Sequence, residues 1–195
     1  MEKTRMGDKI DQTLVKRVQS GDKKAFDILV LKYQHKIVQL ISRYIKDSSE
    51  ALDVAQESFI KAYRALPNFR GDSAFYTWLY RIAINTAKNY LVAQSRRYSY
   101  DNVEVQVAEQ LESAIHLKDQ DTPEHLLLSD EIARTIRQTI DALPDDLRTA
   151  ISLREYEGMS YEEIAHIMDC PVGTVRSRIF RAREAIDKKL KPLLD

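Results

Sequence analysis

The sequence predicts an all-α protein with two small helical domains joined by an acidic linker. Gly and Pro are scarce, at five residues each in a chain of 195, whereas Leu, Ile, Ala, Glu, Lys and Arg are plentiful, as in helical proteins. Apolar residues recur every three or four positions over most of the chain, which is the pattern of amphipathic helices. This periodicity fails at residues 98–122, so we expect one domain over residues 1–97 and another over residues 123–195.

The first domain is expected to contain four helices, at residues 12–20, 23–46, 50–66 and 74–95. Asp22 is suited to cap the second helix, and Ser73 or Asp72 the fourth. Pro67 and Asn68 should end the third helix. The core face of that third helix is predicted to consist of Leu52, Ala55, Phe59, Ala62 and Leu66.

The second domain is expected to contain four more helices, at residues 123–142, 145–156, 161–169 and 172–190. Pro123 is suited to the first helical position behind Thr122. The breaks between the helices fall at Pro144, Gly158 and Pro171. The last two helices are separated by a turn of only a few residues.

The net charge of zero conceals an uneven charge distribution. Residues 1–97 hold 18 Lys or Arg and 10 Asp or Glu, giving +8, whereas residues 98–130 hold one Lys and eight acids, giving −7. Within the second domain, residues 174–191 hold seven bases and two acids, giving +5. Segregated basic patches favour a polyanionic partner. We expect the acidic linker at residues 98–122 to be extended or partly disordered.

Several classes of protein are disfavoured by composition. Cys170 is the only cysteine, so no internal disulfide can form, and we expect it to be a small buried hydrophobe in a cytoplasmic protein. No signal peptide and no run of 18 apolar residues is present, so we expect neither secretion nor direct membrane insertion. There is no HExxH, paired CxxC or GxxxxGK motif. We therefore expect no catalytic residue, no metal and no cofactor.

Residues 160–190 have the layout of a helix-turn-helix, whose second helix enters the major groove of DNA. Ser160 and Glu163 form a capping box at the start of the first helix, and Ala165 is small enough for a steep helix crossing. The inward stripe of the second helix consists of Val175, Ile179, Ala182 and Ile186. The outward side chains are Thr174, Arg176, Ser177, Phe180, Arg181 and Arg183.

These outward side chains are suited to contact with duplex DNA. An arginine fork can bond O6 and N7 of guanine together or hold a phosphate. Thr174 and Ser177 can add a hydroxyl contact, and Phe180 can lie against a thymine methyl group. The alternative is a solvated basic helix packed in a bundle, and this segment taken alone leaves it open.

Residues 69–91 carry a second candidate surface. The side of the predicted helix that should face outward holds Thr77, Trp78, Arg81, Asn85, Lys88 and Asn89, and the preceding loop adds Phe69 and Arg70. A face that mixes aromatic, basic and amide side chains can stack on unpaired bases and hydrogen-bond their edges. The alternative is that Trp78 belongs to the core and Asn85 is merely solvated.

Residues 53–64 expose a charged stripe that consists of Asp53, Gln56, Glu57, Lys61 and Arg64. From these residues alone, the simplest interpretation is a solvated helix face. Asp53 and Glu57 lie one helical turn apart and could hold a metal in an enzyme. Acid pairs at this spacing are usually surface charge, and the four histidines are scattered, so an enzyme is disfavoured.

Taken in order, the three stretches resemble the extracytoplasmic-function sigma factors of bacterial RNA polymerase, and among them the sigma-E envelope-stress type. The resemblance covers about residues 10–192 and is carried by "YRAL-NFRGDS", "AFYTWLYRIAINTAKNYLVAQ" and "SYEEIAHIMDCPVGTVRSRIFRAREAID". It implies that residues 1–97 are sigma region 2 and that residues from about 123 are region 4. Ala55 departs from the branched residue that is usual in the family.

The resemblance implies a role for each surface. The stripe at Asp53, Gln56, Glu57 and Lys61 would dock on the β′ coiled coil of core RNA polymerase, which the chain would also contact through the β subunit. Residues 69–89 would recognise and melt the −10 element as single-stranded DNA, with Phe69 and Asn85 capturing a flipped base. Residues 161–184 would read the −35 element as duplex, through Arg176, Ser177, Phe180 and Arg181. The linker would thread the polymerase channels.

The family also implies a membrane-anchored anti-sigma factor that holds the cytoplasmic chain at the inner membrane until stress releases it. The rival hypothesis is a stand-alone helix-turn-helix regulator that binds duplex operators through residues 161–184 alone. Such a regulator would have no use for the face with Trp78, Asn85 and Lys88. It would also tend to dimerise on a two-fold operator, and no dimerisation helix is evident.

Overall fold

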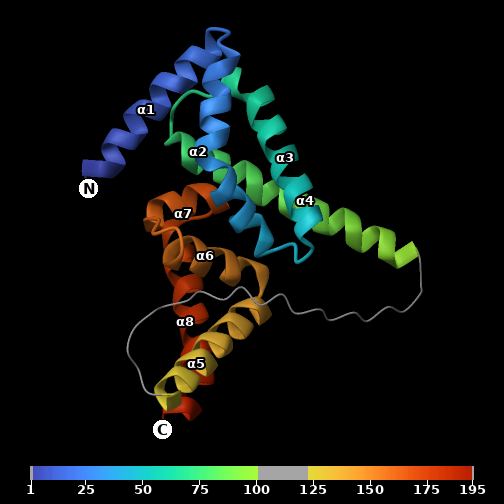
Figure 1. The fold of residues 1–195 in the computed structure, drawn as a ribbon, viewed down its shortest axis with the longest axis vertical. Helices are drawn as coiled ribbons and strands as arrows, with labels where there is room; N and C mark the ends of the chain where they lie inside the picture. The colour runs from blue at the N-terminus through green and yellow to red at the C-terminus, as the bar shows by residue number, and fades with distance from the viewer. Residues whose placement is uncertain (1, 101–122, 195) are drawn as a thin grey trace. The chain divides into compact units, whose positions relative to one another are not determined.

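A computed structural model describes the backbone of residues 2–100 and 123–194, and the side chains of residues 9–96 and 130–193. Within these ranges the chain forms helices and no strand, which confirms the all-α prediction (Figure 1). The elements are α1 (Glu2–Gln19), α2 (Lys23–Ser42), α3 (Ser48–Ala65), the 3₁₀ turn η1 (Leu66–Asn68), α4 (Phe75–Tyr100), α5 (Pro123–Ala142), α6 (Asp145–Glu155), α7 (Tyr161–Met168) and α8 (Val172–Leu194).

Two compact units hold these elements, one built around α1–α4 and the other around α5–α8. Of the linker predicted at residues 98–122, all but the first three residues lie outside the described ranges, and those three continue α4 as far as Tyr100. α1 starts well before the predicted residue 12, and α2 ends four residues before the predicted residue 46. α4 and α8 end later than predicted, at Tyr100 and Leu194 in place of residues 95 and 190, and the other helix ends lie within about two residues of the predicted ones.

The core of the N-terminal unit lies between α2, α3 and α4. α2 contributes large buried side chains, including Leu29, Ile37, Leu40 and Ile41. α3 and α4 contribute many buried alanines: Ala51, Ala55 and Ala62 from α3, and Ala83 and Ala87 from α4. Short side chains let two helix backbones approach closely, so the alanine at position 55 fits the contacts of α3.

The predicted core face of α3 is wrong at Leu52, whose side chain is 49% exposed. Phe59 is only half-buried. The buried stripe consists of Ala51, Val54, Ala55, Ser58 and Ala62. Both stripes have helical periodicity, so spacing alone cannot choose between them. α3 packs through its small residues, which leaves the larger Leu52 and Ile60 in solvent.

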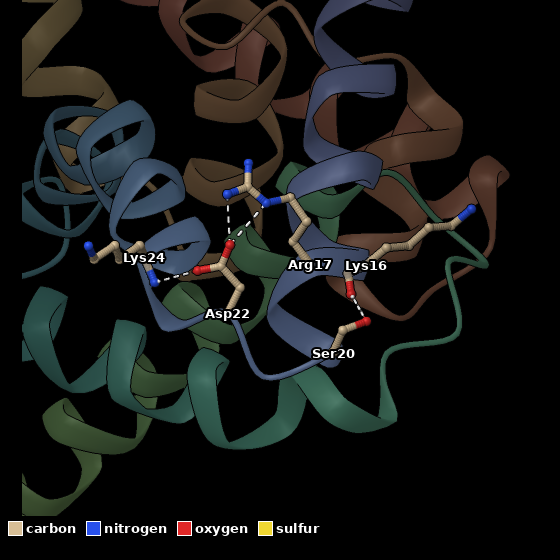
Figure 2. A network of polar contacts seen from close by, with 5 residues as sticks. All are labelled: Lys16, Arg17, Ser20, Asp22 and Lys24. Carbon is tan, nitrogen blue, oxygen red and sulfur yellow. Dashed lines mark hydrogen bonds and ion pairs between the residues drawn. The ribbon is translucent and has the colours of Figure 1, made fainter.

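The junction between α1 and α2 is held by a compact set of polar contacts (Figure 2). Gly21 adopts φ +97°, a conformation that costs little only in glycine, and the backbone NH of Asp22 donates to the carbonyl of Arg17 at 3.0 Å. Asp22 caps α2 as predicted, because its Oδ1 accepts from the NH of Lys24 at 3.1 Å. Its Oδ2 accepts from Arg17 Nη2 at 2.7 Å and from Arg17 Nε at 3.0 Å.

The hydrogen bond from Arg17 holds the pKa of the Asp22 carboxyl below its ordinary value. A carboxyl whose pKa is lowered by folding stabilises the fold above its ordinary pKa. That contribution is lost as the pH falls through the lowered value. The Arg17–Asp22 ion pair therefore makes its full contribution to stability at neutral pH.

α1 is also tied to α2 by a buried carboxylate. Asp11 is 2% exposed, and its Oδ1 lies 2.5 Å from Lys32 Nζ. Its other oxygen accepts a hydrogen bond from the Tyr33 hydroxyl. An unpaired buried charge would be costly, so these two partners on α2 fix where α1 can lie.

In the C-terminal unit, α8 packs against α5 and α6. The predicted inward stripe of α8 is confirmed at Val175, Ile179 and Ala182, which are fully buried, while Ile186 is half-buried. Across from it, α6 buries Ala150, Ile151 and Leu153. One side of α8 is therefore committed to the core along its first three turns.

The start of α7 confirms the predicted capping box. The NH of Ser160 donates to Glu163 Oε2 at 2.8 Å, and the NH of Glu163 donates to Ser160 Oγ at 3.2 Å. α7 ends at Met168, the next residue Asp169 adopts φ +52°, and the NH of Cys170 donates to the carbonyl of Ala165 at 3.1 Å. Asp is one of the few residues that tolerate this left-handed conformation. Caps at both ends thus define the short first helix of the helix-turn-helix.

We predict that Ser160→Ala lowers the free energy of unfolding of the C-terminal unit by about 1 kcal/mol, the usual cost of losing an N-cap side chain. Hydrogen exchange of the α7 amides in the full chain measures this change. Glu162→Ala is the matched control, because Glu162 is an exposed neighbour outside the capping box. Equal protection in Ser160→Ala and Glu162→Ala would contradict the role of the capping box.

Candidate nucleic-acid interfaces

The outward face of α8 is exposed as predicted. Thr174 is half-buried, and the exposed side chains are Arg176, Ser177, Phe180, Arg181 and Arg183. Phe180 is 69% exposed, the largest exposure among the exposed large apolar side chains of the described residues. A phenyl ring held in water beside arginines is suited to a partner that offers both apolar and anionic groups, as the DNA major groove does.

The four arginines of the α8 segment have different partners. Arg178 is half-buried, and its guanidinium binds Asp146 Oδ2 on α6 at 2.5 Å. It also donates to Cys170 Sγ in the turn at 3.3 Å. Arg178 therefore links α8 to α6 and to the turn, and it is not available to a ligand.

Cys170 is half-buried, so the expectation that it is a buried hydrophobe is only partly met.

Arg183 and Glu155 form an exposed ion pair between α8 and α6, with Nη2 and Oε1 2.7 Å apart. The hydrogen bond to Glu155 raises the pKa of the Arg183 guanidinium above its ordinary value. Any anion that binds Arg183 must compete with this carboxylate. Arg181 makes no ion pair or hydrogen bond with another side chain in the described ranges, so it is the freer of the two.

Arg176 is oriented by the ring of Tyr161, the first residue of α7. The guanidinium carbon of Arg176 lies 5.8 Å from the ring centroid, and that of Arg154 lies 5.0 Å from it. Both distances are within the range of a cation–π contact. Arg154 is itself held by a 2.7 Å hydrogen bond from its Nη1 to the carbonyl of Met159. α6 and α7 thus help to set the direction of an α8 side chain.

The second candidate surface lies on α4 and is narrower than predicted. Asn85 and Asn89 are exposed, and Trp78, Arg81 and Lys88 are half-buried. Thr77 was expected on this face, but it is 2% exposed and its hydroxyl has no hydrogen-bond partner among the described residues. The reason is that α4 contacts α1, α2 and α3 at once, which buries more than one side of the helix.

Phe69 joins an aromatic cluster at the start of α4. Its ring centroid lies 4.8 Å from that of Trp78 and 6.3 Å from that of Phe75. Phe75 in turn contacts Tyr33 in the core at 5.8 Å. Phe69 and Trp78 are each half-buried, and Arg70 beside them is exposed. The cluster therefore presents partly accessible aromatic rings beside Arg70, and the Asn85 amide follows two helical turns further along α4. α4 begins at Phe75, so the N-cap position predicted for Ser73 or Asp72 is held by Ala74, whose carbonyl accepts from the NH of Trp78 at 3.2 Å.

The third surface is the outer side of α3. Asp53, Gln56 and Glu57 are exposed as predicted. Lys61 is less free, because its Nζ lies 2.8 Å from Glu57 Oε1 and 3.5 Å from Thr86 Oγ1. The acidic character of the stripe therefore rests mainly on Asp53.

Exposed apolar side chains accompany this stripe, and sequence reasoning missed them. Leu52 and Ile60 of α3 are about half exposed. The available signal was that Ile60 falls off the buried stripe of its helix. Apolar groups beside exposed acids are typical of a protein-binding surface.

The described residues hold no group of three His, Cys, Asp or Glu side chains placed to bind a metal ion. Nor does any helix within the described ranges have the length and apolar character needed to cross a membrane.

Two family models match the chain. Sigma-70 region 2 matches residues 29–97, and sigma-70 region 4 matches residues 133–186. The first match contains the α4 and α3 surfaces, and the second contains α7 and α8 as far as residue 186. Sigma factors are DNA-binding initiation factors, so the expectation that the chain is not an enzyme is confirmed.

Curated relatives match over nearly the whole chain. The RNA polymerase sigma-H factor of Pseudomonas aeruginosa is 68% identical over 184 residues, which cover 94% of this chain and 95% of the relative. The ECF RNA polymerase sigma-E factor of Escherichia coli K12 is 64% identical over 184 residues, covering 94% and 96%. Among solved structures, CnrH in complex with the cytosolic domain of CnrY is 26% identical with a TM-score of 0.67, covering 94% of this chain and 98% of that one. This chain therefore belongs to the extracytoplasmic-function (ECF) RNA polymerase sigma factors.

Proposed function

We propose that this sigma factor opens promoters with a division of labour, in which α8 reads duplex DNA at the −35 element and α4 holds melted DNA at the −10 element. The observation that carries the proposal is that one chain presents two DNA-suited surfaces of different chemistry. The α8 surface is rich in exposed arginines, whereas the α4 surface combines aromatic rings with exposed amides.

At the −35 element, Arg176 and Arg181 are the side chains suited to read bases. Both are exposed on the face of α8 opposite its buried stripe. Arg176 leaves Tyr161 for a guanine edge at little cost, because an exposed cation–π contact is weak. Ser177 and Phe180 lie between the two arginines and can contact a phosphate and a thymine methyl group. Thr174 and Arg183 flank this set, and Arg183 must first leave Glu155.

At the −10 element, the surface formed by Phe69, Trp78 and Asn85 is suited to an unpaired base. Removing a base from the stack costs a few kcal/mol, so melting requires a protein site that stabilises the extruded base. Aromatic rings offer stacking, which contributes about 1–3 kcal/mol per base, and the Asn85 amide can bond to a base edge. Arg70, Arg81, Lys88 and Asn89 supply charge and amides along the strand. Buried Thr77 can act only indirectly.

Docking on the β′ coiled coil of core RNA polymerase is assigned to α3. Asp53, Gln56 and Glu57 are exposed on one face, and Leu52 and Ile60 add apolar area to it. Such a surface can bury apolar contacts while its acids select a basic partner. Lys61 contributes by holding Glu57 in place. The acidic linker at residues 98–122 would lie in a polymerase channel built for nucleic acid. A contact with the β subunit would complete the attachment.

The sigma-E-like relatives favour a role in envelope stress, in a cytoplasmic chain that an inhibitor controls. The solved CnrH structure contains the cytosolic domain of another protein, CnrY. A membrane-anchored anti-sigma factor that covers the DNA and polymerase surfaces would be the corresponding partner of this chain. It would hold the chain at the inner membrane.

In vitro run-off transcription tests the proposed function directly. Core polymerase alone should give no specific product, and core polymerase with the purified chain should give discrete run-off transcripts from a subset of genomic promoters. A stand-alone operator-binding regulator would bind duplex DNA but would yield no transcript with core polymerase. That outcome would overturn the proposal.

We predict that Arg176→Ala and Arg181→Ala each weaken holoenzyme binding by about 1–3 kcal/mol at particular −35 base pairs. Competition binding against promoters substituted one base pair at a time measures the loss and its position. Arg178→Met is the matched control, because Arg178 binds Asp146 and should change stability without changing base preference. Equal losses on all sequences would mean that Arg176 and Arg181 contact only phosphates.

We predict that Asp53→Lys lowers the affinity for core polymerase, because it reverses the main free acid of the α3 stripe. Fluorescence anisotropy of the labelled chain with core polymerase measures the dissociation constant. Glu131→Lys makes the same charge change at an exposed position of α5 and should bind as the unmodified chain does. If the two variants bind core polymerase equally well, α3 is not the docking surface.

A further inference from the structure

Gln19, the last residue of α1, reaches the loop that carries Phe69. Its Nε2 donates to the carbonyl of Leu66 at 3.0 Å and to the carbonyl of Phe69 at 2.9 Å. One amide group has two N–H bonds, so both carbonyls can be bound at the same time. The matched region 2 segment begins at residue 29, so Gln19 lies before the part of the chain that the family model covers.

The two carbonyls are the ends of the short turn that follows α3. The NH of Phe69 also donates to the carbonyl of Leu66, at 3.0 Å. Leu66 is fully buried, which anchors the first end of the turn in the core. The second end, at Phe69, is half-buried and depends on Gln19 and on the ring contacts with Phe75 and Trp78.

The position of Gln19 is itself fixed by the α1–α2 junction. Arg17, two residues before it, holds Asp22 at the cap of α2 (Figure 2). Asp11, two turns earlier, is tied to Lys32 and Tyr33. α1 is therefore anchored to α2 at two points before Gln19, so the Gln19 side chain reaches the loop from a fixed position.

We propose that Gln19 is a positioning residue for promoter melting, which holds the backbone of Phe69 so that its ring is ready to receive an unpaired base. This inference rests on the proposed role of Phe69. A loop that is already ordered loses less conformational freedom when it binds than a loose one does. The advantage should appear in the opening step, where the base leaves the stack, and not in duplex binding at the −35 element.

Gln19→Met tests the proposal in the holoenzyme, because Met has a similar length and no N–H donor. We expect promoter opening, followed by 2-aminopurine fluorescence at the −10 element, to slow by roughly three- to tenfold, the scale of one or two net hydrogen bonds. Affinity for the closed complex should be unchanged. Gln19→Lys, which keeps N–H donors on an unbranched chain, should recover part of the rate.

Two controls separate this effect from a general loss of structure. Ser20→Ala removes only the hydrogen bond from Ser20 Oγ to the carbonyl of Lys16 next to Gln19, and should open promoters at the normal rate. In the free chain, Trp78 is the single tryptophan and lies beside Phe69. Its emission or its quenching by acrylamide should change in Gln19→Met and not in Ser20→Ala.

Phe69→Ala distinguishes failure of this inference from failure of the proposed function. Slow opening by Phe69→Ala together with a normal rate in Gln19→Met would overturn the role of Gln19 alone. A normal rate of promoter opening with Phe69→Ala would overturn the role of Phe69. It would also overturn the role of Gln19, which depends on that of Phe69. If Gln19→Met weakens closed-complex binding and opening by the same factor, Gln19 is only a structural residue, and the proposal is wrong.

Discussion

The DNA-suited side chains of α4 and α8 are held outward by the apolar packing on the opposite side of their own helix. On α8, Val175, Ile179 and Ala182 are committed to the core, so Arg176 and Arg181 have no alternative to solvent. On α4, contacts with three other helices leave only a narrow exposed strip, in which Asn85 and Asn89 lie. The core therefore fixes the rotation of both helices, and the rotation fixes which side chains can meet DNA.

The four arginines of α8 are also divided between contacts within the unit and positions suited to DNA. Asp146 binds Arg178 and Glu155 binds Arg183, so two of the four arginines form ion pairs with α6. Arg176 and Arg181 are exposed, and their guanidinium groups can bind a ligand. An exposed ion pair such as Arg183–Glu155 is weak and can open in favour of a phosphate. The Arg178–Asp146 pair is less exposed on the arginine side, at 22%, and Arg178 also donates to Cys170 Sγ, so Arg178 is the less accessible of the two.

Local signals in the sequence were sufficient for much of this fold. Helical periodicity predicted the helices, and the Ser160–Glu163 capping box and the Asp22 cap occur as predicted. Leu52 and Thr77 were misplaced because periodicity does not reveal how many neighbours surround a helix. The partners of Arg178 and Gln19 were missed because Asp146 and Phe69 lie 32 and 50 residues away. No local pattern reports such contacts. The site roles themselves came from the family resemblance and remain proposals.

The central claim is that duplex reading and strand opening reside on different helices. A footprint of one promoter with holoenzymes that carry Asn85→Ala or Arg181→Ala tests it most directly, with DNase protection reporting the −35 element and permanganate reactivity reporting unpaired thymines at −10. Asn85→Ala should retain −35 protection and lose permanganate reactivity. Arg181→Ala should need more holoenzyme for protection but show normal reactivity once bound. Loss of both signals in parallel in each variant would contradict the claim.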